Sequence, residues 1–304
     1  MGEALTGAAA RLGLGAETLT QRHPRLIYCS ITGFGQDGPY AARAGYDFMI
    51  QGMGGIMDLT GEPDREGQKP GVAIADVFTG LYSVIAIQAA LRRRDLTGVG
   101  AEIDMALFDV QLAILANQAM NYFVSGKAPR RMGNAHPNLV PYQVFEAADG
   151  PLIVATGNDR QARDFCRIVG RPDLAEAPAY ATNADRIRHR ADYIAELSAA
   201  TGKLARADLL DALERAHVPA GPINTVAEAF ADPQAVARRL QMELPATGAK
   251  GGVAPGMRSA IVMDGQGVGA DKAAPRLGER TLVADFSVNA VRRLSIQTGG
   301  VIQV

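Results

Sequence analysis

The ten residues GVAIADVFTG (71–80) place one carboxylate, Asp76, between a short apolar run and a long uncharged segment. Residues 72–75 can be buried, and residues 77–91 (VFTGLYSVIAIQAAL) predict a helix that is buried on most sides. Asp76 is therefore expected at the N-terminus of this helix, where backbone N–H groups favour a negative charge. Taken alone, the pattern is most simply explained by helix capping, since Asp is a preferred N-cap and Thr79 can complete the first turn.

The composition is typical of a soluble globular protein. The chain has 304 residues, of which 47% are hydrophobic and 21% charged, and its net charge is −1. Such a charge favours neither nucleic acid nor an anionic membrane surface as a partner. Cys29 and Cys166 lie far apart, which is typical of a reducing compartment rather than a disulfide framework. No secretory signal is visible, and Arg92 interrupts the longest apolar run, so we expect no membrane-spanning segment and a cytoplasmic location.

The pattern of the first 127 residues predicts both strands and helices. Strands, helices and one glycine-rich loop alternate there. The expected elements are a short helical region over 8–22, a strand over 25–31, the glycine-rich loop over 33–40, helices over 46–58 and 77–91, a strand over 101–105 and one long helix over 106–124.

Composition changes after residue 127, which predicts a second domain. Residues 128–141 are rich in Pro, Asn and Gly and are expected to be a linker, followed by a small α+β domain over 142–224. Its expected elements are a hairpin of strands 142–146 and 152–155, helices over 159–170, 185–200 and 205–216, and a rigid turn over 219–222. Residues 225–304 are expected to link back to the large domain, with a helix over 225–240, a short strand over 259–263 and a helical tail.

Two patterns suggest ligand sites that the surrounding sequence does not support. Gly33, Gly35 and Gly38 spell G-x-G-x-x-G, but Pro39 and Tyr40 follow at once, whereas a dinucleotide site needs a helix to begin there. The glycines can still let the backbone approach a ligand closely. The four histidines have no metal-ligand spacing, so no metal site is expected; they are His23, His136, His189 and His217.

Motifs spread along nearly the whole chain together resemble the class III CoA-transferases. Each is weak alone, but their order and spacing are specific. They are PRLIY (24–28), ITGFGQDGPY (31–40), GYD (45–47), TGEP (60–63), ADVFTG (75–80), GVG (98–100), DMALFD (104–109), HP (136–137), PY (141–142), GNDRQ (157–161), VPAGP (218–222) and PRLGE (275–279). The resemblance implies an α/β fold with a Rossmann-like large domain, a smaller α+β domain and an interlocked homodimer.

The resemblance also implies a reaction in which one carboxylate acts as nucleophile. The residue matching Asp76 attacks an acyl-CoA thioester and passes through an aspartyl anhydride and an aspartyl-CoA thioester. Such a reaction needs no metal and no cofactor beyond the CoA substrate. A helix N-terminus would keep Asp76 ionised, and its N–H groups could stabilise oxyanions. Substrate-binding positions implied by the matching motifs are Gln36, Tyr46, Asp47, Gly157 and Asn158; a hairpin turn explains Gly157 equally well.

Two other interpretations remain open. The α-methylacyl-CoA racemases share the fold and the aspartate, but they use a histidine in a Gly-His-Asp motif as a second acid–base group. This chain has Gly45-Tyr46-Asp47 there, and tyrosine, with a reference pKa of about 10, is a poor base near neutral pH. The third interpretation is a catalytically impaired homologue, because function depends on an intact site rather than a fold.

The motifs of this chain match the family pattern only from a point after its first strand–helix units. Family members start with strand–helix units that carry part of the CoA site, and this chain starts at a point matching the end of them. We therefore expect a shortened sheet with an exposed edge, exposed apolar surface and weakened CoA binding. Neither the acid substrate nor the acyl-CoA donor can be identified from the motifs.

Overall fold

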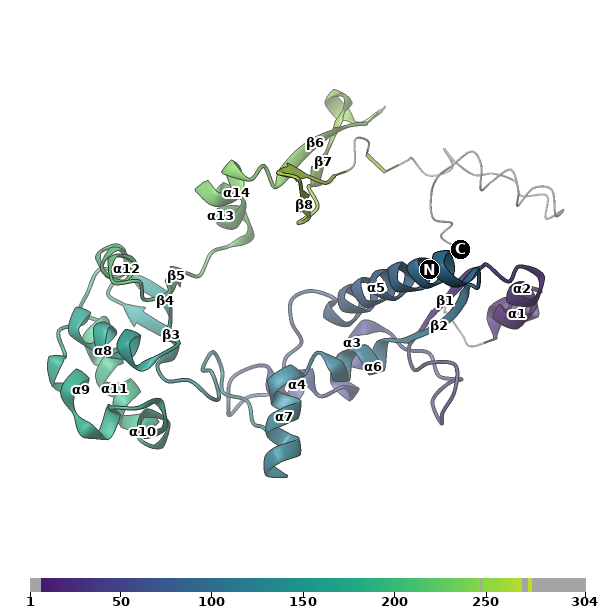
Figure 1. Ribbon diagram of the computed structural model, residues 1–304. Helices are drawn as coiled ribbons and strands as arrows, with labels where there is room; N and C mark the ends of the chain where they lie inside the picture. The colour runs from purple at the N-terminus through teal and green to yellow at the C-terminus, as the bar shows by residue number, and fades with distance from the viewer. Residues whose placement is uncertain (1–6, 247, 270–272, 275–304) are drawn as a thin grey trace. The chain divides into compact units, whose positions relative to one another are not determined.

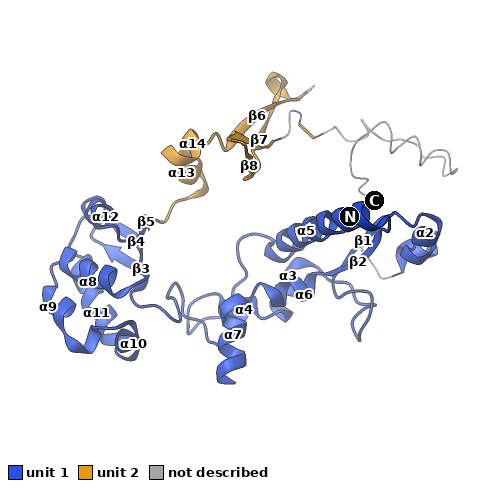
Figure 2. Cartoon of the chain, viewed as in Figure 1, with its two compact units in different colours: residues 1–222 blue, residues 223–304 orange. Residues whose placement is uncertain are grey.

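The computed structural model describes residues 7–246, 248–269 and 273–274 (Figure 1). Its contacts divide the chain into two compact units, Met1–Pro222 and Ile223–Val304 (Figure 2). The division falls two residues before the predicted boundary at 224. The first unit contains both the parallel strand pair next to Asp76 and the predicted small domain.

The parallel pair is built from strands β1 (Ile27–Thr32) and β2 (Ala101–Ala106), with Ile27 opposite Ala101. Parallel strands need a long crossover connection, and helix α5 (Ile74–Thr97) lies in this connection and packs on both strands. The predicted strands and the predicted apolar helix are therefore confirmed. The helix continues past Arg92 and ends before Gly98, whose φ of +76° suits a glycine C-cap.

Shorter helices precede and follow these strands in the sequence. Helices α1 (Ala8–Arg11) and α2 (Ala16–Arg22) precede β1, and α3 (Asp47–Met53) and α4 (Ile56–Leu59) precede α5. Helices α6 (Leu107–Ala113) and α7 (Ala116–Ser125) follow β2. Of these shorter helices, α2 contacts both strands and α6 contacts β2. The prediction of one long helix over 106–124 is wrong, because Ala116 has a φ of +48° and interrupts it. The helix predicted over 46–58 is likewise divided, at Gly55, whose φ is +82°.

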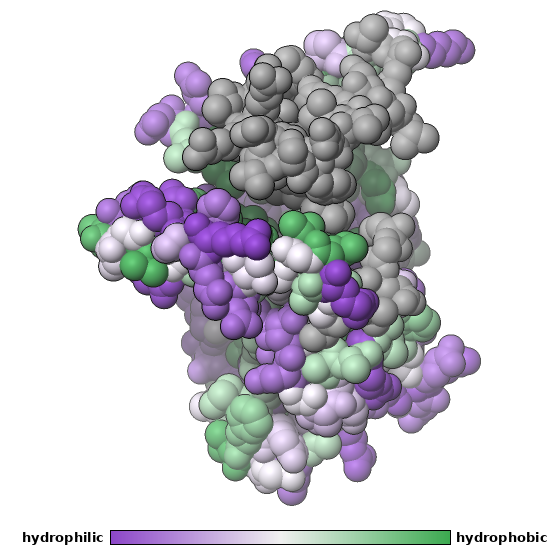
Figure 3. Space-filling view, turned by 90° about the vertical axis from the view of Figure 1, so that its right-hand side faces the viewer, coloured by the Kyte–Doolittle hydropathy of each residue, from purple (hydrophilic) through white to green (hydrophobic). Residues whose placement is uncertain are grey.

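The prediction that α5 is buried on most sides is also wrong. Only Ala75, Thr79, Ser83 and Ala90 of this helix are buried, and Ile85 is 65% exposed. Apolar side chains therefore reach the surface of the described chain, as green areas show in Figure 3. By length and composition alone, α5 could cross a membrane, contrary to the sequence prediction. Length and composition are weak evidence for a membrane span, since α5 packs on both strands of the parallel pair as a crossover helix.

The small domain contains a three-stranded antiparallel sheet and six short helices. Strands β3 (Tyr142–Ala147) and β4 (Gly150–Ala155) form the predicted hairpin. The predicted turn over 219–222 is instead strand β5 (Ala220–Pro222), which pairs with β4. The helical elements are α8 (Asp159–Ile168), α9 (Pro172–Glu176), the 3₁₀ helix η1 (Pro178–Tyr180), α10 (Asn183–Arg188), α11 (Arg190–Thr201) and α12 (Arg206–Arg215).

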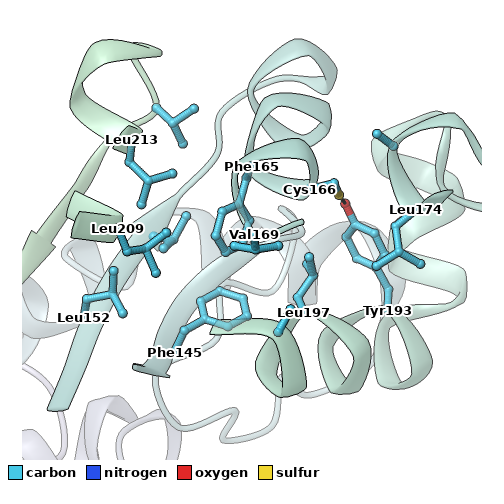
Figure 4. Packing of buried hydrophobic residues seen from close by; sticks show 14 of the residues in the cluster. Phe145, Leu152, Phe165, Cys166, Val169, Leu174, Tyr193, Leu197, Leu209 and Leu213 are labelled. Atoms are coloured by element: carbon cyan, nitrogen blue, oxygen red, sulfur yellow. Dashed lines mark hydrogen bonds between the residues drawn. The ribbon is translucent and has the colours of Figure 1, made fainter. Parts of the chain in front are cut away.

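These helices and the sheet enclose a well-packed apolar core (Figure 4). Phe145 of β3 and Phe165 of α8 meet edge to face, with ring centroids 5.3 Å apart. Tyr193 of α11 is buried, and its hydroxyl lies 3.0 Å from the Cys166 sulfur, which gives a buried polar atom its partner. This core makes the small domain the best-packed part of the described chain, because the cluster beside β1 has only three buried residues.

The second unit contains two α-helices, one short 3₁₀ helix and two small hairpins in its described part. Helices α13 (Val226–Ala231) and α14 (Pro233–Ala237) replace the single helix predicted over 225–240, because Pro233 begins a new helix. Strands β6 (Gln241–Pro245) and β7 (Val253–Met257), which flank the short 3₁₀ helix η2 (Lys250–Gly252), were not predicted. Strand β8 (Val262–Met263) falls in the predicted strand 259–263 and pairs with β9 (Gln266–Gly267). The predicted helical tail lies outside the described residues.

Candidate active site

The loop that follows β1 touches the start of α3 at two glycines. A Cβ added to Gly33 would lie 2.6 Å from the Cα of Gly45, and a Cβ added to Gly45 would lie 2.6 Å from the Cα of Gly33. Only glycine permits such an approach. No helix begins between Gly33 and Tyr46, so the G-x-G-x-x-G pattern is a close-packed loop and not the start of a dinucleotide-binding helix. The close approach brings Tyr46 and Asp47 next to the carboxyl end of β1.

Side chains at the ends of β1 and β2 hold the same loop. The Gln36 backbone N–H donates to Asp104 Oδ2 at 2.8 Å, and the Gly35 N–H donates to Thr32 Oγ1 at 2.9 Å. The Phe108 N–H donates to the Gly33 carbonyl at 3.0 Å. Ligands of open α/β sheets bind outside the carboxyl ends of the strands, so this loop lies where a substrate is expected. Gln36 is half-buried within it.

Asp76 is the third residue of α5 and does not cap it. The N-cap position belongs to Ala73, which has no side chain that can accept a hydrogen bond. The simple capping interpretation of Asp76 is therefore wrong. Its side chain is exposed, and it lies in the first turn of the crossover helix between β1 and β2. A carboxylate in this position is accessible to a substrate.

The cap of α5 comes instead from Asp47, the first residue of α3. Asp47 Oδ1 accepts hydrogen bonds from the backbone N–H groups of Ala75, at 2.8 Å, and of Asp76, at 3.3 Å. Its other oxygen, Oδ2, accepts from Nε2 of the buried Gln51 at 2.5 Å. The structure thus brings two predicted site residues, Asp47 and Asp76, together.

This arrangement corrects the expectation that the first turn of α5 supplies free N–H groups for an oxyanion. Asp47 takes two of them. The Ile74 N–H donates to the Val72 carbonyl at 2.9 Å, and the Val77 N–H donates to the Ala73 carbonyl at 3.0 Å. The N–H groups of residues 74–77 therefore all have partners within the chain, so these amides are not free to bind an oxyanion.

The electrostatic environment of Asp76 also differs from the expectation. Partial burial, and secondly the negative charge of Asp47, raise the pKa of the Asp76 carboxyl above its ordinary value. A free helix N-terminus would have lowered this pKa, but Asp47 has taken its N–H groups. A carboxylate with a raised pKa is more basic, and this favours its use as a nucleophile once it is ionised.

The remaining predicted residues are placed in two groups. Tyr46 occupies the N-cap position of α3, its carbonyl accepts from the Ile50 N–H at 3.0 Å, and its side chain is 60% exposed. Gly157 and Asn158 lie in the small domain, between β4 and α8. Asn158 Oδ1 accepts from the Gln161 N–H at 3.0 Å, and the Gly157 N–H donates to Gln161 Oε1 at 2.9 Å.

Helix capping thus accounts for Asn158, since it is the N-cap of α8. The hydrogen bonds of the Gly157 N–H and of Asn158 Oδ1 stay within their own turn, and Gln161 Nε2 continues the network to the His217 carbonyl at 3.0 Å. The contacts therefore do not connect these two residues with Asp76. A role for them in substrate binding stays a prediction.

No role was predicted for three residues that organise these regions. Gln51 follows Asp47 by four residues, so one helical turn brings it to the carboxylate. Asp104 holds the glycine-rich loop. Arg186 is 1% exposed and donates to the Val140 carbonyl at 2.6 Å and to Asp159 at 2.7 Å, beside Asn158. The i, i+4 spacing could have identified Gln51; the partners of Asp104 and Arg186 are distant in sequence.

Metal-binding clusters are absent from the part of the chain that the structure describes: no group of three or more His, Cys, Asp or Glu side chains there could hold an ion.

Solved structures share this fold. The chain is 52% identical to a CaiB/BaiF family protein from Brucella suis, with a TM-score of 0.76 over 96% of this chain and 73% of that chain. The Mycobacterium tuberculosis protein Rv3272 is 24% identical, with a TM-score of 0.78 over 90% of this chain and 72% of that one, which shows the fold alone. The predicted α/β class is confirmed.

Named relatives extend the comparison. A succinate–glutarate CoA-transferase of Agrobacterium fabrum is 53% identical over 89% of this chain and 67% of its own length. The mouse succinyl-CoA:glutarate CoA-transferase is 40% identical, over 78% of this chain and 55% of its own length. The chain thus spans roughly half to two thirds of the length of these relatives. The model of CoA-transferase family III matches residues 4–281, and the chain belongs to this family.

Proposed function

We propose that the protein transfers CoA from an acyl-CoA donor to a carboxylic acid acceptor, with Asp76 as the nucleophile. One observation carries this assignment. Asp76 presents an exposed carboxylate with a raised pKa on the first turn of α5, beside the loop at the carboxyl ends of β1 and β2. Family membership, and relatives named as CoA-transferases, support it.

The proposed reaction needs only acyl transfers. An Asp76 oxygen attacks the donor thioester carbonyl, the C–S bond breaks, CoA leaves as a thiolate, and Asp76 is left as a mixed anhydride with the donor acyl group. The thiolate attacks the Asp76 carbonyl of the anhydride, which releases the donor carboxylate and forms an aspartyl-CoA thioester. The acceptor carboxylate then attacks this thioester, displaces the thiolate and forms a second mixed anhydride with Asp76. The thiolate attacks the acceptor's acyl carbonyl in this anhydride, which releases the new acyl-CoA and regenerates the Asp76 carboxylate.

No step of this sequence changes an oxidation state, and aspartate itself is the covalent carrier, so we propose that the reaction uses no metal or cofactor other than the CoA substrate. Gln36 and Tyr46 are proposed to contact the substrate from the loop and from the start of α3. Gly157 and Asn158 are proposed to contact it from the small domain. The oxyanion donors are groups other than the occupied first-turn amides of α5.

The proposed substrates are short dicarboxylic acids. The names of two relatives contain succinate or succinyl-CoA together with glutarate. We therefore propose succinyl-CoA as donor and glutarate as the first acceptor to try. We also propose a cytoplasmic homodimer, as the resemblance to the family implies.

Intact-mass spectrometry tests the nucleophile. The protein is incubated with succinyl-CoA, and Asp76→Ala serves as the matched variant. A mass increase that corresponds to CoA thioester formation, present in the unaltered chain and absent from Asp76→Ala, supports the assignment. An adduct of the same size on Asp76→Ala would refute the role of Asp76.

Solvent exchange separates this function from the racemase alternative. A racemase incorporates deuterium at the α-carbon of a 2-methylacyl-CoA incubated in D₂O, whereas CoA transfer leaves that position protonated. Incorporation that depends on Asp76, without CoA transfer, would replace the proposed function with racemisation. Neither activity in a folded chain would favour an impaired homologue.

A further inference from the structure

The first turn of α5 depends on a side chain from another helix. Ala73 at the N-cap makes no side-chain hydrogen bond. Asp47, 28 residues before Ala75 in the sequence, provides the acceptor through Oδ1. Its second bond is to the N–H of Asp76 itself, at 3.3 Å. The peptide group that carries the proposed nucleophile is therefore tied directly to α3.

The carboxylate that makes this contact is itself fixed. Gln51 is fully buried one turn later in α3, and its Nε2 donates to Asp47 Oδ2 at 2.5 Å. The two oxygens of Asp47 thus have different partners, so rotation of the carboxylate would break both contacts. Gln51 Oε1 is buried and has no hydrogen-bond partner in the described chain. Burying an amide oxygen without a hydrogen-bond partner costs free energy. The hydrogen bond from Nε2 to Asp47 is the contact that explains why a glutamine occupies this position.

The close packing around α3 adds to this fixation. Gly45 and Gly33 meet backbone to backbone two residues before Asp47, and Ile50 packs with Ala75 in a buried cluster. The start of α3 is thereby held both to the loop after β1 and to the first turn of α5. Asp47 is half-buried at the centre of these contacts.

We propose that Asp47, held by Gln51, is a positioning residue for Asp76 rather than a substrate-binding residue. Its carboxylate fixes the first turn of α5 and thereby the direction from which the nucleophile approaches the thioester. The catalytic part of this inference rests on the proposed function. The hydrogen bonds that it invokes are present without substrate, so they can be tested independently of activity.

Two substitutions separate a hydrogen-bond role from a loss of folding. Asp47→Ala removes both acceptors. Asp47→Asn keeps one oxygen for the α5 amides, and the Gln51 amide can turn so that its unpaired Oε1 accepts from the new Nδ2. Asp109→Ala is the matched control, because Asp109 also lies in the first turn of a neighbouring helix, α6, but is exposed.

The first measurement is amide hydrogen exchange at Ala75 and Asp76 in the full chain without substrate. We expect exchange of these two amides to rise about tenfold in Asp47→Ala and to change less than about threefold in Asp47→Asn and Asp109→Ala. Unchanged exchange in Asp47→Ala would overturn the proposal, whether or not the chain proves to be a CoA-transferase.

The second measurement is the rate of adduct formation as a function of succinyl-CoA concentration. A positioning residue changes the maximal rate, and we expect Asp47→Ala to lower it by about 10- to 100-fold with the half-saturating concentration unchanged. Asp47→Asn is expected to restore most of the rate. A raised half-saturating concentration with an unchanged maximal rate would show substrate binding and overturn the positioning role. Absence of any adduct in the unaltered chain would refute the proposed function, and the exchange result alone would then decide the capping role.

Discussion

Replacement of the buried arginine of the small domain, Arg186→Met, is expected to destabilise that domain strongly. Arg186 donates to the Val140 carbonyl at 2.6 Å, to the Tyr180 carbonyl at 3.0 Å and to the Asp159 carboxylate at 2.7 Å. Methionine fills much of the space but donates to none of these acceptors. The residue thus ties the end of the linker to the start of α8, next to the turn that carries Asn158.

The expected loss of unfolding free energy follows from the acceptors that lose their hydrogen bonds to Arg186. Val140 is buried, so its carbonyl loses a partner that water cannot easily replace, at a cost of about 1–3 kcal/mol. Breaking a fully buried ion pair costs about 3–5 kcal/mol, but Asp159 is 43% exposed and water compensates part of that loss. We therefore expect the free energy of unfolding to fall by about 3 kcal/mol. At a typical urea dependence of about 2 kcal/mol per molar, the midpoint falls by roughly 1.5 M.

Urea unfolding followed by tyrosine fluorescence measures this change, since the chain has no tryptophan and Tyr180 and Tyr193 pack with ring centroids 4.5 Å apart. Arg188→Met is the matched control on the same helix, because Arg188 is 66% exposed and its ion pair with Asp185 is expected to contribute less than about 1 kcal/mol. Equal shifts for the two variants would refute the reasoning that burial makes Arg186 important.

Three further predictions concern the region around the nucleophile. Gly33→Ala and Gly45→Ala are each expected to lower the melting temperature by several degrees and to slow adduct formation, because the new Cβ would meet backbone at 2.6 Å; Gly221→Ala, with open space around its Cβ, is the control, and equal melting temperatures would contradict this. Asp76→Asn is expected not to lower the melting temperature at neutral pH. Because the pKa of the Asp76 carboxyl is raised in the folded chain, ionised Asp76 destabilises the folded chain relative to the unfolded chain. This penalty is present at high pH and is lost as the pH falls through the folded pKa. Since only the carboxylate attacks, adduct formation is expected to decline as pH falls, with its midpoint above the ordinary aspartate value of about 3.9, and Asp47→Asn should move that midpoint to lower pH; a shift to higher pH would contradict the role of the Asp47 charge.

The sequence by itself determined the main local elements and the candidate nucleophile. The two strands that flank an apolar helix, the hairpin over residues 142–155 and the helix over 206–215 follow from local periodicity and turn residues. The position of Asp76 at the start of an apolar helix follows from the same pattern. Family membership followed from the order of short motifs and is confirmed by the comparisons.

Helix breaks were harder to predict than helices. Ala116 interrupts the predicted helix over 106–124 although alanine favours helix, and its positive φ depends on its surroundings. Strand β5 looked like a turn because Pro219 and Pro222 flank a glycine, and it is a strand because β4 offers an edge with which to pair. Such outcomes depend on contacts between segments that are distant in the sequence.

Only the tertiary structure decided how Asp76 is held. The local pattern taken alone was most simply explained by Asp76 capping its own helix, and the nucleophile interpretation expected the helix N-terminus to keep Asp76 ionised. In the structure Asp47 takes those N–H groups and Asp76 is left exposed with a raised pKa. The reason is physical: a backbone amide bonds to whichever acceptor packing brings within reach, and the acceptor here comes from α3, 28 residues away from Ala75. Periodicity can place a carboxylate on a helix, but the partner of that helix is decided by how the chain packs.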